Sequence, residues 1–196
     1  MASASPARSV ALALDVIGWS LRFYGRHLGL VVGISLIPSA QRAVSQLWGE
    51  QMPSWAGMAG EVVTTVVRVV LFVVILRIAI LDDDRLREVP GAAAWQRVVR
   101  FARREWRSLV VQVLAFAALF AFADLVPDRV IAPRIPAGAH DTYWATLLAI
   151  KNPTVIAFSM IWQIGAVRQA LLLGAPCVMP APGSGHDRRR DTVDDD

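Results

Sequence analysis

Three charged side chains, Arg42, Arg68 and Asp124, lie inside long segments that are otherwise almost wholly apolar. If these segments cross a membrane, such residues usually face the interior of a helix bundle and pair, because a buried charge costs about 2.5–3.5 kcal/mol on insertion scales. An Arg68–Asp124 pair, with Arg42 nearby, could then hold a phosphate or a carboxylate. The alternative is that both arginines extend to outer headgroups while Asp124 pairs locally, which their closeness to the membrane surface favours.

No other combination of side chains predicts a reaction. His27, His140 and His186 lie on different segments, and the single cysteine, Cys177, excludes an intramolecular disulfide and a cysteine-based metal cluster. The run 82–84 of three aspartates could suggest a metal site, but acidic runs at the ends of apolar segments are usually solvated. We therefore expect no catalytic residue, no metal and no cofactor, and a protein that is not an enzyme.

The composition predicts an integral membrane protein. Of the 196 residues 55% are hydrophobic, against roughly 45–50% in soluble proteins, and the mean hydropathy is +0.46. Charges are confined to short blocks between apolar windows, as a bilayer requires. Lys151 is the only lysine among 20 basic residues, and this arginine bias indicates a GC-rich bacterial genome.

The apolar windows predict an all-α fold with four transmembrane helices, at about 28–47, 62–81, 108–126 and 153–175. Two amphipathic helices, 10–26 and 92–107, are expected to lie on the membrane surface before the first and third spans. Residues 1–180 would form one membrane domain, and 181–196 a disordered cytoplasmic tail. The arginines of these surface helices that we expect to bind lipid headgroups are Arg22, Arg26, Arg97, Arg100, Arg104 and Arg107.

Two similar stretches, RFYGRHLGLVV from Arg22 and RFARREWRSLVV from Arg100, each join a surface helix to a span. Each half then reads surface helix, span, outer loop, span, which indicates a parallel two-fold internal repeat. Chance similarity between two short segments is the alternative. Arginine is concentrated in 82–107 and absent from 48–60, so the positive-inside rule places the central loop and both termini in the cytoplasm.

The segment 15–38, DVIGWSLRFYGRHLGLVVGISLIP, resembles the multi-span membrane domain attached to some bacterial glycerophosphodiester phosphodiesterases. It also resembles related uncharacterised membrane families. The matching positions are Trp19, Phe23, Arg26, His27, Leu28, Gly29 and Pro38. The resemblance covers this segment and, more weakly, the second copy. It implies a membrane scaffold and transfers no catalytic residue, since the chain carries no soluble phosphodiesterase domain.

These observations leave two functions open. The first is a non-catalytic accessory or scaffold subunit of a bacterial inner-membrane complex for transport, envelope synthesis or respiration. The alternative is a small homo-oligomeric transporter or lipid-handling protein with an outer-leaflet site for an anion or headgroup. We expect membrane lipids, with anionic headgroups on the cytoplasmic side, and other membrane subunits as partners in a multi-pass plasma-membrane protein. Nucleic acid is not expected, because Trp95 and Trp106 back the basic segment 97–107 and suit a bilayer.

Overall fold

The computed structural model describes residues 5–176, and the regular elements among them are all helical. The α-helices α1 to α7 are Pro6–Arg26, Leu28–Trp48, Ser54–Leu76, Gly91–Arg104, Trp106–Leu125, His140–Lys151 and Ala157–Leu173. Shorter turns extend them: the 3-10 turns Gly49–Gln51, Ala132–Arg134 and Ala137–Ala139, and the π turns Arg77–Leu81, Val126–Ile131 and Asn152–Ile156. Cys177, His186 and the predicted tail 181–196 lie outside the described residues.

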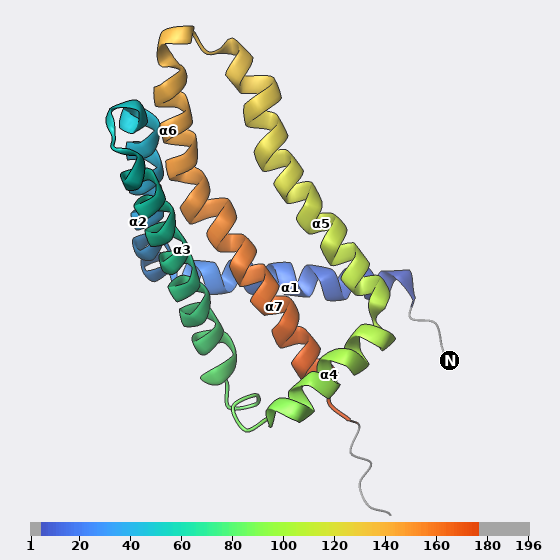
Figure 1. The fold of residues 1–196 in the computed structure, drawn as a ribbon. Coiled ribbons are helices and arrows are strands. Elements are labelled where there is room, and N and C mark those ends of the chain that lie inside the picture. The colour runs from blue at the N-terminus through green and yellow to red at the C-terminus, as the bar shows by residue number, and fades with distance from the viewer. Residues whose placement is uncertain (1–4, 177–196) are drawn as a thin grey trace, which may run out of the picture.

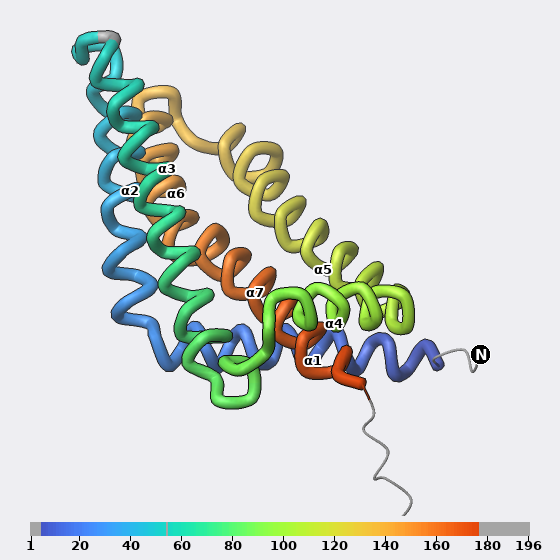
Figure 2. Tube along the Cα trace, turned by 60° about the horizontal axis from the view of Figure 1, so that its bottom comes forward, coloured from blue at the N-terminus to red at the C-terminus, as the bar shows by residue number. Residues whose placement is uncertain are grey.

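Four helical stretches are long and apolar enough to cross a membrane: Leu28–Gln51, Trp55–Leu81, Trp106–Arg134 and Ala137–Leu173. The predicted helical class and the four apolar helices are therefore confirmed. Figures 1 and 2 show these helices running between two ends of an elongated molecule, with α1 lying transverse to α2 and α3. We call the end that carries α4 and the turn 82–90 the α4 end, and the end that carries 49–53 and 132–139 the α6 end.

The last apolar helix begins earlier than predicted. α6 and α7 are joined by the π turn at Asn152–Ile156 into one continuous helix, so the predicted start at 153 lies inside this helix. Proline has no backbone N–H, and a π turn accommodates Pro153 without ending the helix. As a result, Lys151 and Asn152 lie in the interior of an apolar helix and not in a loop before it.

The core forms where α2, α3 and α7 meet. Val31, Ile75 and Ile161 have no exposed surface there. Beyond this core, α2 packs closely on α6, because small residues let the two backbones approach: the Ser39 Oγ donates to the Ser35 carbonyl at 2.8 Å and is 2.9 Å from the Ala149 carbonyl. Small side chains at helix contacts are the usual means of close packing in membranes.

α1 packs along α7 and against the start of α5. Its buried face has helical spacing and consists of Ser9, Ala13, Val16, Ser20 and Phe23. The Trp19 ring packs against Gly165 of α7, where an added Cβ would lie 2.8 Å from the indole ring. The apolar face that was predicted to lie on the membrane surface therefore packs largely against other helices of the chain. Val10, Leu14 and Leu21 form a second apolar stripe on α1, which is exposed.

Two corners in the chain have nearly the same backbone. α1 turns into α2 at His27, with φ −113° and ψ 23°, and α4 turns into α5 at Glu105, with φ −118° and ψ 30°. The N–H of each corner residue donates to the carbonyl of the phenylalanine four residues earlier, at 3.0 Å to Phe23 and 2.8 Å to Phe101. Both phenylalanines are buried, so each fixes its corner from inside.

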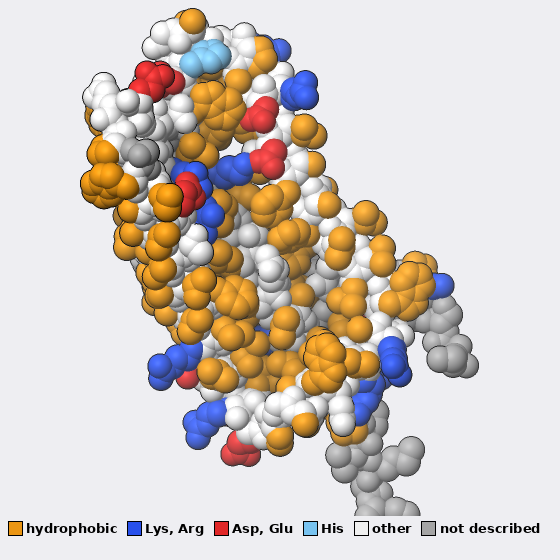
Figure 3. Space-filling model, viewed as in Figure 1, with side chains coloured by type: hydrophobic (Ala, Val, Ile, Leu, Met, Phe, Trp, Pro, Cys, Tyr) orange, Lys and Arg blue, Asp and Glu red, His pale blue; other side chains and the backbone are white. Residues whose placement is uncertain are grey.

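The surface between the two ends is apolar. Figure 3 shows charged side chains gathered towards both ends of the visible face, with a broad hydrophobic belt between them. On α3 the outward residues Val62, Val66, Val69 and Val73 are each more than half exposed and recur at helical spacing. Soluble monomers rarely expose continuous apolar surface of this extent, whereas a lipid bilayer requires it.

Candidate functional site

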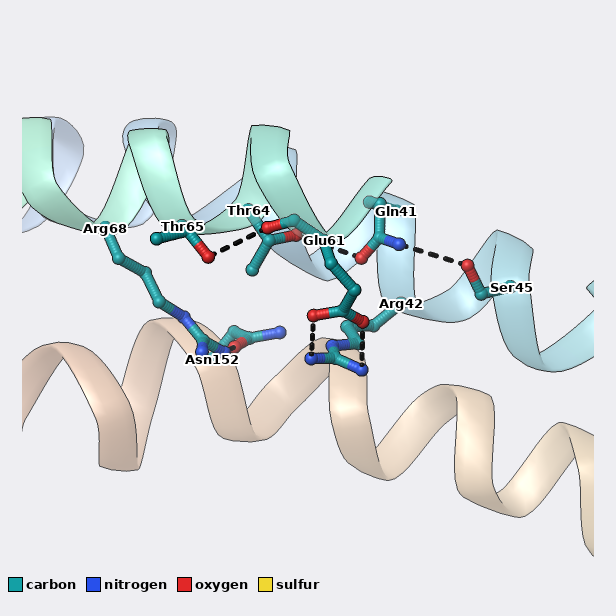
Figure 4. A network of polar contacts seen from close by, with 8 residues as sticks. All are labelled: Gln41, Arg42, Ser45, Glu61, Thr64, Thr65, Arg68 and Asn152. Atoms are coloured by element: carbon teal, nitrogen blue, oxygen red, sulfur yellow. Dashed lines mark hydrogen bonds and ion pairs between the residues drawn. The ribbon is translucent and has the colours of Figure 1, made fainter. Parts of the chain in front are cut away.

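The polar residues of the α6 end form a network between α2, α3 and the last helix (Figure 4). Arg42 and Glu61 make a two-point ion pair, with both N–O distances 2.8 Å. Neither side chain is fully buried, so water and headgroups can reach the pair. Glu61 therefore occupies the guanidinium face that Arg42 was predicted to offer to a ligand.

Arg68 reaches from α3 to the π turn of the last helix. Its Nη2 donates to the Asn152 Oδ1 at 2.9 Å (Figure 4). The Asn152 Nδ2 in turn donates to the Leu148 carbonyl at 3.2 Å. Asn152 is almost completely buried, so this contact ties the two helices together inside the bundle. An arginine that bonds a buried amide in this way has a structural role.

A small cavity adjoins Arg68 and measures about 10 Å³. The Arg68 Nε and the Ser35 Oγ, both buried and without a hydrogen-bond partner among the described residues, belong to side chains that line it. This volume is at the lower limit for one water molecule, which needs roughly 10–15 Å³. The geometry therefore offers no room for a phosphate or a headgroup beside Arg68.

Beside these residues a neutral chain of hydrogen bonds joins α2 to α3. The Thr64 Oγ1 donates to the Gln41 Oε1 at 3.0 Å, and the Gln41 Nε2 donates to the Ser45 Oγ at 3.1 Å (Figure 4). Thr64 is buried, and its hydroxyl is satisfied by this contact. The residues that complete the network, namely Glu61, Gln41 and Asn152, were not singled out from the sequence.

The predicted ion pair between Arg68 and Asp124 is wrong. Asp124 of α5 pairs with Lys151 at the end of α6. The physical reason is the longer last helix, which brings Lys151 and Asn152 to the level at which Asp124 and Arg68 need partners. Arg42 and Arg68 thus lie in one region, as expected, but each is bonded to a different helix and Asp124 belongs to a separate pair.

At the α4 end two arginines of α4 contact the end of α7. The Arg100 Nη1 donates to the Gly174 carbonyl at 2.8 Å, and the Arg97 Nη1 lies 3.5 Å from the Leu171 carbonyl. Both carbonyls belong to the final turn of α7, where unpaired acceptors and the negative end of the helix dipole favour cations. Two of the arginines expected to bind headgroups therefore cap a helix.

The other predicted lipid-binding arginines differ among themselves. Arg104 lies 3.5 Å from the carboxylate of Glu105, and Arg107 lies over the Trp106 ring at 5.6 Å from its centroid. Arg22 and Arg26, on α1, are exposed and make no hydrogen bond or ion pair within residues 5–176. These two remain available for an external anion.

A further ion pair links the turn after α3 to α7. The Arg168 Nη2 is 2.6 Å from the Asp83 Oδ2, the Arg85 N–H donates to the Asp83 Oδ1 at 3.0 Å, and the Arg168 guanidinium lies 5.4 Å from the Trp19 ring centroid. Burial alone would raise the pKa of Asp83, but the hydrogen bonds and positive charges of Arg168 and Arg85 outweigh it and hold this pKa below its usual value. The aspartate run thus contributes an inter-helix contact.

Within residues 5–176, no three His, Cys, Asp or Glu side chains come together as a metal site. His27 packs against the Phe23 ring at 4.6 Å, and His140 contacts the Ile135 carbonyl at 3.0 Å. The comparisons with known proteins found no matching family model, no matching curated protein and no matching solved structure. The resemblance of the first corner to phosphodiesterase-associated membrane domains stays a prediction.

Proposed function

We propose that the chain is a multi-pass protein of the bacterial plasma membrane with the α4 end, and both termini, in the cytoplasm. The apolar belt between two charged ends supports the membrane location (Figure 3). The arginine-rich segment 82–107 lies at the α4 end, which the positive-inside rule assigns to the cytoplasm. α1 carries Arg22 and Arg26 beside its exposed apolar stripe, a combination suited to a headgroup layer.

Reporter fusions test this orientation. A reporter active only outside the cytoplasm should give signal after Gly57 and after Ala137, and none after Arg87. Signal at Arg87 with silence at Gly57 would reverse the orientation, and signal at all three positions would contradict the membrane location itself.

Within that membrane, the protein acts as a non-catalytic accessory or scaffold subunit. The observation that carries this proposal is the uneven burial of its apolar helices: only 6% of the most apolar stretch of Trp106–Arg134 is buried within the chain, against 50% for Ala137–Leu173. Figure 1 shows α5 set apart from α2 and α3, on the other side of the last helix. On this helix Ala117 and Ala121 are exposed at small-xxx-small spacing, which permits close contact with another helix. We assign that position to a span of a different membrane subunit.

Native mass spectrometry of gently solubilised protein tests this assignment. We expect a stoichiometric complex with a second membrane protein, lost in Ala117→Leu/Ala121→Leu because the larger side chains fill the contact. The matched control, Val66→Leu/Val69→Leu, enlarges exposed residues on α3 and should keep the complex. Equal loss in both variants, or a homodimer with no second subunit, would contradict the accessory role.

The second candidate is a homo-oligomeric lipid-handling protein. The outer site at Arg42, Arg68 and Asp124 gives it little support, since each of these side chains has a protein partner. What favours it is a basic cavity at the α4 end, lined in part by Arg22 and Arg26. A homodimer that retains phospholipid would support this candidate over the first.

The matching corners at His27 and Glu105 support a duplication of the two halves as the origin of the chain. Superposition of α1 to α3 on α4 to α7 in an experimental structure, with the two corners in register, tests it. A better fit out of register would favour chance similarity between the two corner sequences.

A further inference from the structure

A cavity of about 260 Å³ lies at the α4 end between the second half of α1, the π turn Arg77–Leu81 and α7. Its size is slightly below the roughly 300–1,000 Å³ of sites for drug-sized ligands, so it suits a headgroup and not a whole lipid. Three arginines, one histidine and one aspartate line it: Arg22, Arg26, Arg168, His27 and Asp83.

The charges of this cavity do not cancel. Asp83 is bonded to Arg168 through one oxygen, at 2.6 Å, and to the Arg85 N–H through the other, at 3.0 Å. Both carboxylate oxygens are therefore already engaged by Arg168 and Arg85. Arg22 and Arg26 have no partner of their own within residues 5–176 and leave two uncompensated positive charges at the cavity.

The remainder of the lining is apolar and aromatic. Ile78 and Ala79 come from the π turn that ends the second apolar helix, and Trp19 and Phe23 come from α1. The cavity thus combines positive charge with apolar and aromatic surface, at the level where an apolar helix ends. This is the arrangement that the boundary between headgroups and acyl chains presents.

We propose that this cavity binds the phosphate of an anionic membrane phospholipid, with the guanidinium groups of Arg22 and Arg26 as its donors. Arginine matches phosphate with two parallel N–H bonds, and its charge makes each bond stronger than a neutral one. Ile78 and Trp19 contact the glycerol and the first acyl carbons. The assignment rests on the proposed membrane location of the protein, but it does not require the accessory role or an orientation.

The test uses the full chain purified in detergent and titrated with phosphatidylglycerol or phosphatidylcholine, with bound lipid measured by native mass spectrometry. We expect phosphatidylglycerol to bind at least tenfold more tightly than phosphatidylcholine. Arg22→Gln/Arg26→Gln should remove most of this difference, and Arg22→Lys/Arg26→Lys should keep a substantial part of it. Thermal unfolding should be unchanged in both variants, because neither arginine has a partner among residues 5–176.

A charge-matched control separates the cavity from general surface attraction. Arg87→Gln/Arg103→Gln removes the same charge at the same end from exposed residues that do not line the cavity, and should change binding by less than twofold. Equal losses in the two double variants would overturn the proposal. Displacement of phosphatidylglycerol by millimolar inorganic phosphate would also overturn it and assign the cavity to a soluble phosphate compound. Because the assay uses the isolated chain, absence of a partner subunit leaves its outcome unaffected.

Discussion

The two corners of the chain share a backbone but differ in what their side chains do. At His27 and at Glu105 the dihedral angles, the hydrogen bond and the buried phenylalanine correspond. His27, however, is only half buried and stacks on Phe23. Glu105 is 3% exposed and forms an ion pair with Arg8 at 3.0 Å, which connects the second corner to the start of α1.

The arginines that precede the two phenylalanines diverge in the same way. Arg22 has no protein partner among the described residues, whereas Arg100 caps the end of α7. The same local pattern, Arg-Phe before a corner, thus leaves one guanidinium for an external anion and bonds the other to the end of α7. A local sequence pattern determines the backbone of a corner, and the neighbouring helix determines the use of its charges.

The largest difference in stability should appear where α1 and α4 contact α7. A Cβ at Gly174 would lie 2.1 Å from the Arg97 carbonyl oxygen, a backbone atom that cannot move alone, whereas a Cβ at Gly165 would meet the Trp19 ring, which can shift. We expect Gly174→Ala to lower the free energy of unfolding by about 3 kcal/mol and Gly165→Ala by about 1 kcal/mol. Chemical unfolding in mixed micelles measures both.

Gly29→Ala serves as the control for this pair, since nothing lies within 4 Å of an added Cβ there. It should leave stability unchanged or slightly higher, because alanine favours a helix. If Gly165→Ala costs as much as Gly174→Ala, the distinction between a side-chain contact and a backbone contact would be lost.

The corner residues themselves should give the next largest effect. Glu105→Gln removes the buried negative charge that holds Arg8, and we expect a loss of about 1–2 kcal/mol, partly offset because the carboxylate no longer has to be desolvated. His27→Gln at the equivalent corner should change stability by less than about 0.5 kcal/mol, the usual range for substitutions without a specific partner. A larger loss at His27 would refute the contrast between the corners.

Substitutions of the equivalent arginines, Arg100 and Arg22, should differ by a smaller amount in their effect on stability. Arg100→Met keeps most of the stem volume but removes the charged donor to the Gly174 carbonyl, so we expect a loss of about 1 kcal/mol from the end of α7. Arg22→Met should leave the unfolding midpoint in detergent unchanged while weakening binding of phosphatidylglycerol. Reversed results, with stability lost at Arg22 only, would exchange the roles assigned to the two side chains.

The smallest effect concerns the ion pair between Asp83 and Arg168. Because the folded state holds the pKa of Asp83 below its ordinary value of 3.8, the pair stabilises the protein above that pH and loses its contribution as the pH falls through the lower, folded pKa. Asp83→Asn should therefore be less stable than wild type at pH 7 and approach it in strong acid. Asp84→Asn is the control, since Asp84 is exposed and makes no ion pair within residues 5–176.

Much of the fold could be predicted because hydropathy and backbone chemistry act locally. The first span, predicted at 28–47, corresponds to α2 at Leu28–Trp48, and the corner after the Arg-Phe motif lies where the similarity of the two stretches placed it. The start of the last helix was missed because Asn152-Pro153 is typical of a break. Inside a bundle, neighbouring groups can satisfy the freed backbone, here with the Tyr24 hydroxyl donating to the Pro153 carbonyl at 2.9 Å.

The candidate site could be predicted only in outline. That Arg42 and Arg68 lie in the same region follows from their depth in antiparallel helices. Their partners, Glu61 and Asn152, do not follow from the sequence, because pairing depends on helix rotation and on a π turn that shifts every later residue around the helix axis. The capping role of Arg97 and Arg100 was missed because a basic helical face looks the same whether it contacts headgroups or a helix end.

The packing of α1 against α7 also has a consequence for biosynthesis. The Tyr24–Pro153 contact spans 129 residues, which a ribosome translating roughly 5–20 residues per second needs about 6–26 s to cover. During that interval α1 has been made but the helix that will cover Ser20 and Phe23 has not. The packing of the first helix is therefore completed only after the last helix has been synthesised. A chain interrupted before α7 would expose this face of α1 to the cell's quality-control proteases.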